Sequence, residues 1–233
     1  MMIDPFCDST PAHPFRTAPP LRTFDSDAAR VPYDGQTRMR LAIPSGLASA
    51  RIVIDPAARD LLTVDCGGGP QPRIRLAGGE LALIWRLSVG EWLREMFTVG
   101  FGGVAIVLHP AVAWTIAIRG GLSDCELDLT AGTVARVDIG GGCSEVLLDL
   151  PSPTAVVPVR ISGGASRLGI RRPAETGVAV DVAGGVSMLR VDERAFDAIG
   201  GAAQLDAGDT TRGVPHYALT IGGGASGLSI ERR

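Results

Sequence analysis

Apolar and polar residues alternate through the second half of the chain, and a Gly-Gly-x-Ser block interrupts the alternation at regular intervals. The five blocks span residues 120–123, 141–144, 163–166, 184–187 and 223–226. The second glycines of the first four blocks lie 21 or 22 residues apart, and the last gap of 39 residues is close to two periods. A fixed period of this length is typical of one supersecondary unit stacked on copies of itself.

Each block is flanked by apolar residues at fixed positions, three and five residues before its second glycine and four and six residues after it. The twenty residues at these positions are Ile116, Ile118, Cys125, Leu127, Val137, Ile139, Val146, Leu148, Val159, Ile161, Leu168, Ile170, Val180, Val182, Leu189, Val191, Leu219, Ile221, Leu228 and Ile230. Spacing by two places side chains on one face of a strand. Each repeat therefore predicts a strand, a Gly-Gly bend and a second strand, with polar residues facing water.

The glycines and serines of the blocks are the predicted structural residues of the repeat. Glycine suits a bend that needs positive φ or a close approach between backbones. The serine hydroxyl can bond to local backbone or to the serine of the next repeat. A serine nucleophile is the alternative, but five copies without a partnered histidine disfavour it. The residues are Gly121, Ser123, Gly142, Ser144, Gly164, Ser166, Gly185, Ser187, Gly224 and Ser226.

Charged residues also recur at matching positions of the repeats. Seven residues after the second glycine the column contains Asp128, Asp149, Arg171, Asp192 and Glu231. If these positions stack in sequence order, Arg171 lies between two aspartates, which favours a single register. A carboxylate cluster of a polysaccharide-active enzyme, centred on the three aspartates, is the alternative; the interrupting arginine disfavours it.

The chain before the repeats divides into two parts. Residues 1–37 are rich in proline and small polar residues and predict a disordered arm without a secretory signal. The repeat domain is expected to span residues 38–233. Within it, Arg51–Ile54 and Leu62–Cys66 read as strands of earlier, degraded repeats, and Gly78-Gly79 has apolar neighbours at the offsets of a repeat bend.

One short segment departs from strand periodicity. Ser88-Val89-Gly90-Glu91 matches a capping box, and apolar residues with helical spacing follow it. A short helix is therefore expected near residues 89–97, covering an end or edge of the stack or docking to a partner. Its candidate interaction residues are Trp92, Leu93, Met96 and Phe97.

The composition bears on the partners, the location and the cofactors to be expected. The net charge of −3 gives no electrostatic footprint for nucleic acid or an acidic membrane surface. The four cysteines lack metal-ligand spacing, and Cys66 and Cys125 fall on inward positions, which favours a reduced, cytoplasmic location. Asp197, Asp206, Asp209 and His216 lack the tight spacing of a cation site, so neither a metal nor a cofactor is expected.

The pattern of strand, Gly-Gly-Ala-Ser, strand and proline-bearing link (Pro151-Ser152-Pro153, Arg172-Pro173) resembles a known bacterial group. These are the putative-adhesin or auto-transporter head-type repeat domains of unknown function, to which the C-terminal domain of LiaF-type cell-wall-antibiotic response proteins is similar. The resemblance implies a right-handed, single-chain β-solenoid and no catalytic residues. A repeat-built β-sandwich remains the alternative fold.

These features predict an all-β, non-enzymatic scaffold for protein–protein interaction, including self-association through its ends. The last repeat runs to the end of the sequence, so its outer edge is expected to be open for pairing with another chain. A carbohydrate-binding, cell-envelope or envelope-stress module is the first alternative function, and a solenoid polysaccharide-active enzyme is the second.

Overall fold

Strands make up the regular structure of the protein, and the computed structural model describes them over residues 28–85 and 103–233. The described residues contain strands β1 to β19 and no helix, which confirms the all-β class. The helix expected near residues 89–97 lies outside the described residues. Its candidate residues Trp92, Leu93, Met96 and Phe97 lie there too.

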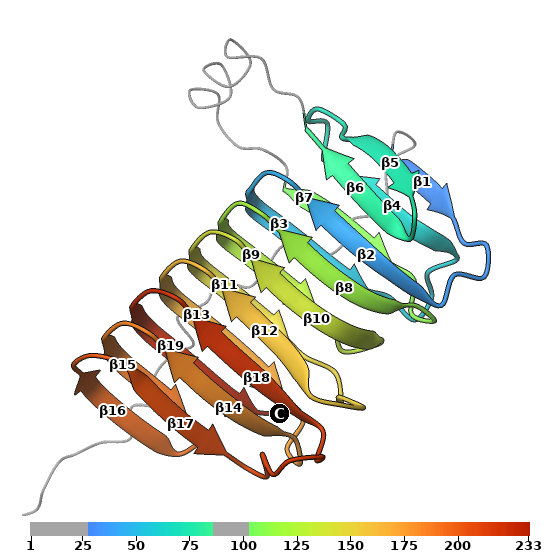
Figure 1. Ribbon diagram of the computed structural model, residues 1–233. Helices are drawn as coiled ribbons and strands as arrows, with labels where there is room; N and C mark the ends of the chain where they lie inside the picture. The colour runs from blue at the N-terminus through green and yellow to red at the C-terminus, as the bar shows by residue number, and fades with distance from the viewer. Residues whose placement is uncertain (1–27, 86–102) are drawn as a thin grey trace, which may run out of the picture.

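The strands form two facing mixed sheets, called sheet A and sheet B below (Figure 1). Sheet A has ten strands in the order β1 (Ala29–Pro32), β4 (Asp60–Asp65), β7 (Val104–Leu108), β3 (Leu47–Ile54), β9 (Leu122–Asp128), β11 (Cys143–Asp149), β13 (Ala165–Arg172), β19 (Ala225–Arg232), β15 (Val186–Val191) and β16 (Arg194–Ile199). Sheet B has nine strands in the order β5 (Arg73–Ala77), β6 (Glu80–Ile84), β2 (Arg38–Ile43), β8 (Ala113–Ile118), β10 (Thr133–Ile139), β12 (Val157–Ile161), β18 (His216–Ile221), β14 (Gly177–Val182) and β17 (Ala203–Ala207).

Each predicted repeat forms what we call a rung: a strand of sheet B, a glycine bend and a strand of sheet A. Neighbouring rungs pair in parallel with matching residues opposite each other, as Val137 pairs with Val159 and Val146 with Leu168. All twenty predicted apolar positions are buried in one core between the sheets. The strand–bend–strand prediction is therefore confirmed.

The order of the rungs in space differs from their order in the sequence at the C-terminal side. The last rung, β18–β19, lies between β12–β13 and β14–β15 and pairs in parallel with both. Figure 1 shows this as a red rung between yellow and orange ones. The prediction that the last repeat provides an open edge is wrong, because a strand with neighbours on both sides has no free edge.

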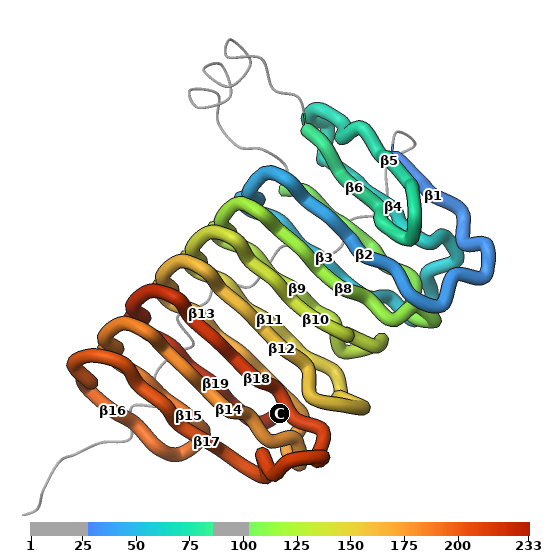
Figure 2. The backbone as a smooth tube through the Cα atoms, in the orientation of Figure 1, coloured from blue at the N-terminus to red at the C-terminus, as the bar shows by residue number. Residues whose placement is uncertain are grey.

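The same departure occurs at the N-terminal side. The rung β2–β3 lies between β6 and β8 in sheet B and between β7 and β9 in sheet A. The chain therefore leaves this rung, builds the N-terminal end of the stack and returns past it to β8 (Figure 2). Stacking of each rung on the preceding one holds only for β8–β9, β10–β11 and β12–β13.

Antiparallel strands form both ends of the stack. At one end β16 pairs with β15 and β17 with β14; at the other β1 pairs with β4 and β5 with β6. Gly78-Gly79, expected to be a bend between sheets, is instead the turn of the β5–β6 hairpin within sheet B. Both glycines have positive φ, as a two-residue hairpin turn requires.

Strand β1 (Ala29–Pro32) precedes residue 38, the predicted start of the repeat domain, and pairs with β4. The high proline content of residues 1–37 concealed this strand in the sequence. Pro32 lies at the end of an edge strand, where its missing N–H costs no hydrogen bond of the sheet. Two facing sheets built from repeats are the arrangement that the predicted solenoid and the alternative sandwich share.

Candidate interaction surfaces

The glycine bends form a continuous column along one side of the stack. A Cβ added to Gly141 would lie 2.6 Å from the backbone nitrogen of Gly121, and one on Gly142 would lie 2.9 Å from the carbonyl oxygen of Gly164. The bends are also joined by hydrogen bonds, such as that from Gly163 N to the Gly141 carbonyl oxygen (3.0 Å). Glycine is therefore required at these bends because the backbones of neighbouring rungs approach closely, and not because the bends have positive φ.

Positive φ occurs three residues after the second glycine of each rung. The residues are Ser49, Asp124, Glu145, Arg167, Gly227 and Met188, in the order in which they stack. Each interrupts the pairing of its strand for one residue, and the register is kept because the neighbouring strand skips the matching residue. Their side chains form an exposed column in which Ser49 donates to Asp124 (3.1 Å), Arg167 pairs with Glu145, and Met188 is 65% exposed.

The predicted serines also form a column next to the glycines. Ser123, Ser144, Ser166 and Ser226 follow one another in register, and the Oγ atoms of Ser226 and Ser187 are 3.1 Å apart. The described histidines lie in other contacts. His109 stacks on Tyr33 with ring centroids 3.8 Å apart, and Nδ1 of His216 lies 2.8 Å from the Val214 carbonyl oxygen.

A shallow, open groove follows the bends and is lined by small residues. Its lining is Leu122, Gly142, Cys143, Ser144, Gly164, Ala165, Ser166 and Gly224. Burial raises the pKa of the Cys143 thiol to about 12, so the thiol is protonated at neutral pH and is a poor nucleophile. The groove offers hydroxyl and backbone groups and no charge.

The aspartates of the predicted carboxylate column each have a polar partner. Asp128 accepts hydrogen bonds from the backbone and side chain of Thr130 (3.2 and 2.7 Å). Asp149 accepts two hydrogen bonds from Arg171, both of 2.6 Å, which raise the pKa of that arginine. The Arg171–Asp149 contact joins opposite charges on adjacent strands, as predicted for charges that fix register, whereas Asp128 bonds within its own turn and lies beside Asp149.

Asp192 belongs to a buried cluster that the sequence pattern did not reveal. Nη2 of Arg172 donates to both carboxylate oxygens (2.7 and 2.9 Å), Nη1 donates to the Thr176 carbonyl oxygen (2.7 Å), and Arg232 lies 3.1 Å from the carboxylate. The Arg172 side chain has no exposed surface, and this burial lowers its pKa. The signal in the sequence was Arg172 itself, a charged residue two positions after Ile170 and therefore on the inward face of the strand.

The two ends of the stack expose strand edges. Within the described residues, β16 and β17 at one end, and β1 and β5 at the other, each pair with a strand on one side only. Unpaired backbone N–H and C=O groups on an edge strand are a template for pairing with another chain. These edges, rather than the C-terminal rung, are therefore the candidate surfaces for association.

The remaining predicted sites lie apart from one another. Asp209 accepts hydrogen bonds from Thr211, which lower its pKa. Within residues 28–85 and 103–233 no group of three His, Cys, Asp or Glu side chains is placed to hold a metal ion. In the same ranges no helix is long and apolar enough to cross a membrane.

Neither a family model nor a curated protein sequence matches the chain. A solved structure with a similar fold is that of a putative cell adhesion protein from Clostridium sporogenes ATCC 15579. It superposes with a TM-score of 0.51 at 13% identity, over 89% of this chain and 98% of that chain. The likeness agrees with the predicted adhesin-like fold. The similarity to LiaF-type proteins stays a prediction.

Proposed function

We propose that this protein is a non-enzymatic scaffold that binds other proteins through the strand edges at the two ends of a solenoid-like stack. The observation that carries the proposal is that four edge strands, β1, β5, β16 and β17, each have one unpaired side in the described part of the chain. Strand addition to such an edge gives affinity through main-chain hydrogen bonds, so it needs no preformed pocket.

The side chains of the stack support a binding role over a catalytic one. The carboxylates that an enzyme would need are used in hydrogen bonds and ion pairs that fix the rungs, as Arg171 and Arg172 do with Asp149 and Asp192. The groove along the bends contains no ionisable group other than a thiol with a raised pKa. A general acid or base needs a pKa near the working pH.

Carbohydrate or cell-envelope binding is the second candidate function. The similar solved structure favours it, because that protein is described as a cell adhesion protein. Sugar rings bind on exposed aromatic faces, whereas among the described aromatics Trp114 and Tyr217 are buried, Tyr33 stacks on His109, and Trp85 is half-buried and donates to the Pro70 carbonyl oxygen (3.1 Å). Of the two candidates we therefore favour protein binding. We also propose a cytoplasmic location, supported by the buried free thiols of Cys66, Cys125 and Cys143.

A photo-crosslinking amino acid placed at the ends tests the scaffold function. Ala77 on β5 and Ala198 on β16 are exposed positions on edge strands, and Ala135 on β10 is an exposed position in the middle of the stack. We expect protein adducts in producing cells from the two end positions and none from Ala135. Adducts from Ala135 alone, or none from either end, would contradict the proposal.

A further inference from the structure

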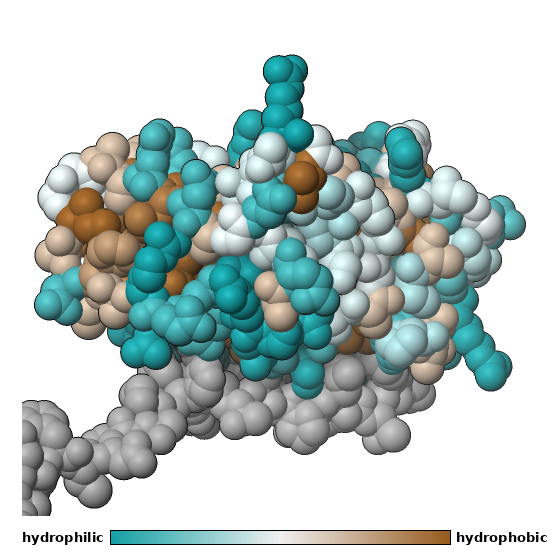
Figure 3. Space-filling model, turned by 90° about the horizontal axis from the view of Figure 1, so that it is seen from below, coloured by the Kyte–Doolittle hydropathy of each residue, from teal (hydrophilic) through white to brown (hydrophobic). Residues whose placement is uncertain are grey.

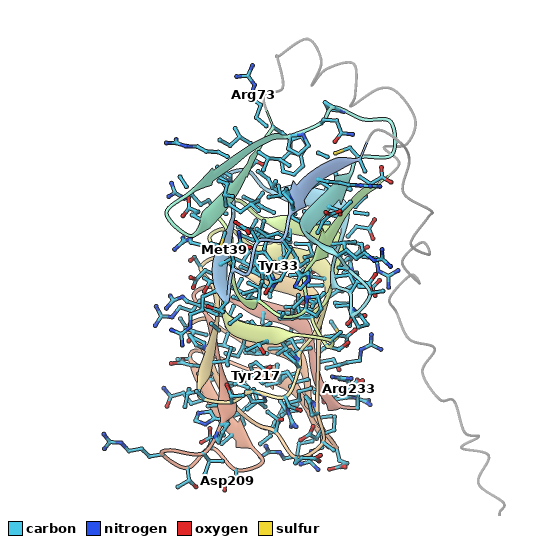
Figure 4. The ribbon with its side chains drawn as sticks, turned by 90° about the vertical axis from the view of Figure 1, so that its right-hand side faces the viewer. Tyr33, Met39, Arg73, Asp209, Tyr217 and Arg233 are labelled. Carbon is cyan, nitrogen blue, oxygen red and sulfur yellow. The ribbon has the colours of Figure 1, made fainter. Side chains whose placement is uncertain are left out.

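The edge strands at the N-terminal end of the stack carry positive charge. β1 has the sequence ARVP and β5 has RIRLA, so the two strands contain three arginines and no acidic residue. Arg30, Arg73 and Arg75 are all exposed. Figure 4 shows Arg73 extending from this end of the molecule. In the strands next to these edges, Glu80 of β6 pairs with Arg40 at 3.4 Å, and Asp60 and Asp65 of β4 are half-buried, Asp65 accepting a hydrogen bond from Gly67 N (2.8 Å).

The edge strands at the other end carry the opposite charge. β16 has the sequence RAFDAI and β17 has AQLDA, which gives two aspartates and one arginine. Arg194 donates to the Asp206 carbonyl oxygen (2.6 Å), which leaves the carboxylate of Asp206 facing water. The loop after β17 carries exposed Asp209 and Arg212 and so leaves the negative balance of the two strands unchanged; Asp209 lies opposite to Arg73 along the stack (Figure 4).

Each end also exposes part of the hydrophobic core. Phe196, Ile199 and Leu205 pack against the core at the acidic end but are only partly buried, and Val31 and Ile74 do so at the basic end. Figure 3 shows hydrophobic surface toward the side where the acidic end lies. An apolar centre surrounded by charged residues is the usual composition of a protein–protein interface.

The edges of sheet B also agree in length, direction and alternation. β5 and β17 have five residues each, and both run antiparallel to the parallel strands between them. Ile74 and Leu205 pair with buried Leu83 and Val180 and so face the core, while the arginines of β5 and Asp206 face water. With Ile74 beside Leu205, a parallel pairing would place Arg75 beside Asp206.

We propose that the partner of each end is the opposite end of a second copy of this chain, so that the copies associate head to tail and continue both sheets. In this arrangement β5 pairs with β17 in sheet B, and β1 pairs with β16 in sheet A. The proposal rests on the use of the ends in the proposed scaffold function and names their partner. Because the two contacting surfaces differ, the contact is heterologous and can repeat to form chains of molecules.

The same charges prevent the other pairings of two copies. Contact between two basic ends would bring arginines of β1 and β5 together, and contact between two acidic ends would do the same for aspartates. Like charges placed opposite each other across strands are destabilising. Charged side chains on edge strands commonly prevent edge-to-edge aggregation, and here they oppose contact between like ends. Contact between unlike ends is therefore favoured.

Charge reversal at one end at a time tests the proposal. The basic end is reversed in R30E/R75E, with one arginine from each edge strand, and the acidic end in D197R/D206R. We expect the wild type to form oligomers whose mass rises with concentration and falls with salt, measured by sedimentation velocity. Each variant alone brings like charges together at the contact, so its association should weaken by more than about tenfold. An equimolar mixture of the two variants restores both contacts and should form oligomers again.

A control variant separates the ends from general charge effects. R119E/R160E makes the same charge change at exposed positions in the middle of the stack and should associate like the wild type. A monomeric wild type, a single variant that still assembles, or a mixture that stays monomeric would each overturn head-to-tail association. If the wild type is monomeric but crosslinkers at Ala77 and Ala198 still capture another protein, the scaffold function stands without self-association.

Discussion

At the scale of single residues, the glycine bends show how a repeat sequence can require glycine without using positive φ. In each bend the backbone of one rung lies where the Cβ of the next would have to be. The side chain is excluded by neighbouring backbone, which cannot move aside as a flexible side chain could. Gly141 is an example, with three backbone atoms of Gly120 and Gly121 within 3 Å of its hypothetical Cβ.

Substitution of Gly141 therefore tests the tight stacking. We expect Gly141→Ala to lower the free energy of unfolding by about 1–3 kcal/mol, because an inserted carbon in a packed site forces the backbone to shift. Gly200→Ala is the matched control, since a Cβ at Gly200 meets no atom within 4 Å and its φ is not positive. Urea denaturation of both variants measures the difference. Equal losses at the two sites would contradict the role of close approach.

The thiol of Cys143 gives a second prediction at this scale. Its pKa is about 12 in the folded protein, above the ordinary value of 9.0, because burial disfavours the thiolate. Above pH 9 the Cys143 thiol therefore ionises in the unfolded chain while it stays protonated in the folded protein. This favours unfolding, so the stability that the thiol contributes is lost as pH rises toward 12. The slope is at most about 1.4 kcal/mol per pH unit. Cys143→Ala should make the fall in unfolding free energy between pH 9 and 11 shallower, measured by urea denaturation; an unchanged slope would contradict it.

At the scale of elements, the Arg172 cluster holds three strands together. Arg172 ends β13, Arg232 ends β19 and Asp192 directly follows β15, so the ion pair joins the two strands on either side of β19. Arg233 adds to the contact, because its backbone N donates to the Arg172 carbonyl oxygen (2.9 Å). The cluster therefore stabilises the insertion of the last rung.

Removal of the charge of Asp192 should be costly for this reason. Asp192→Asn leaves Arg172 buried without a counter-charge, which costs about 3–5 kcal/mol of stability. Asparagine tolerates the positive φ of 53° at this position, so backbone strain adds little. Asp149→Asn is the control: its partner Arg171 is 37% exposed and can be hydrated, so about 1 kcal/mol is expected. Thermal and urea unfolding would compare the two, and equal losses would contradict the buried cluster.

The sequence predicted the elements well and their order poorly, for a physical reason. Alternation identifies which residues of a strand face the core, and all twenty predicted positions do. It contains no information on which rung is the neighbour, because every rung offers the same aliphatic face and the same glycine bend. Gly164 and Gly185 are one period apart in the sequence, yet Gly224 lies between them. Gly78-Gly79 was misread for a related reason, since a glycine pair suits a hairpin turn as well as a bend.

Among the candidate surfaces, those that follow the sequence period were predicted, and those that depend on the spatial order of the rungs were not. The serine column was predicted, because its positions follow the period, and Ser187 and Ser226 do lie together. The column of positive φ was not, since Asp124, Glu145 and Arg167 share no residue type that would signal it. The open ends were assigned to the wrong strands, because only the spatial order of the rungs shows that β16 and β17 are outermost.

At the scale of the whole molecule, the first and last rungs, β2–β3 and β18–β19, both lie inside the stack. The strands nearest the C-terminus, β18 and β19, have neighbours on both sides, whereas β16 and β17 do not. The last rung can therefore pair fully only when β12–β13 and β14–β15 are both in place. Its contacts also include the Tyr217 hydroxyl, which donates to the Pro151 carbonyl oxygen (2.6 Å) and has a pKa raised by burial.

Engineered disulfides distinguish this arrangement from a stack in sequence order. Ser166 is the register partner of Ser226, and Ser226 is the register partner of Ser187. Adjacent strands lie about 4.8 Å apart, within the Cα separation that a disulfide spans, whereas Ser166 and Ser187 are two strands apart, beyond about 7 Å. The variant S166C/S226C should therefore form an intrachain disulfide on mild oxidation, and S166C/S187C should not. A stack in sequence order gives the reverse result, and mass spectrometry of the non-reduced peptides would show which pair is joined.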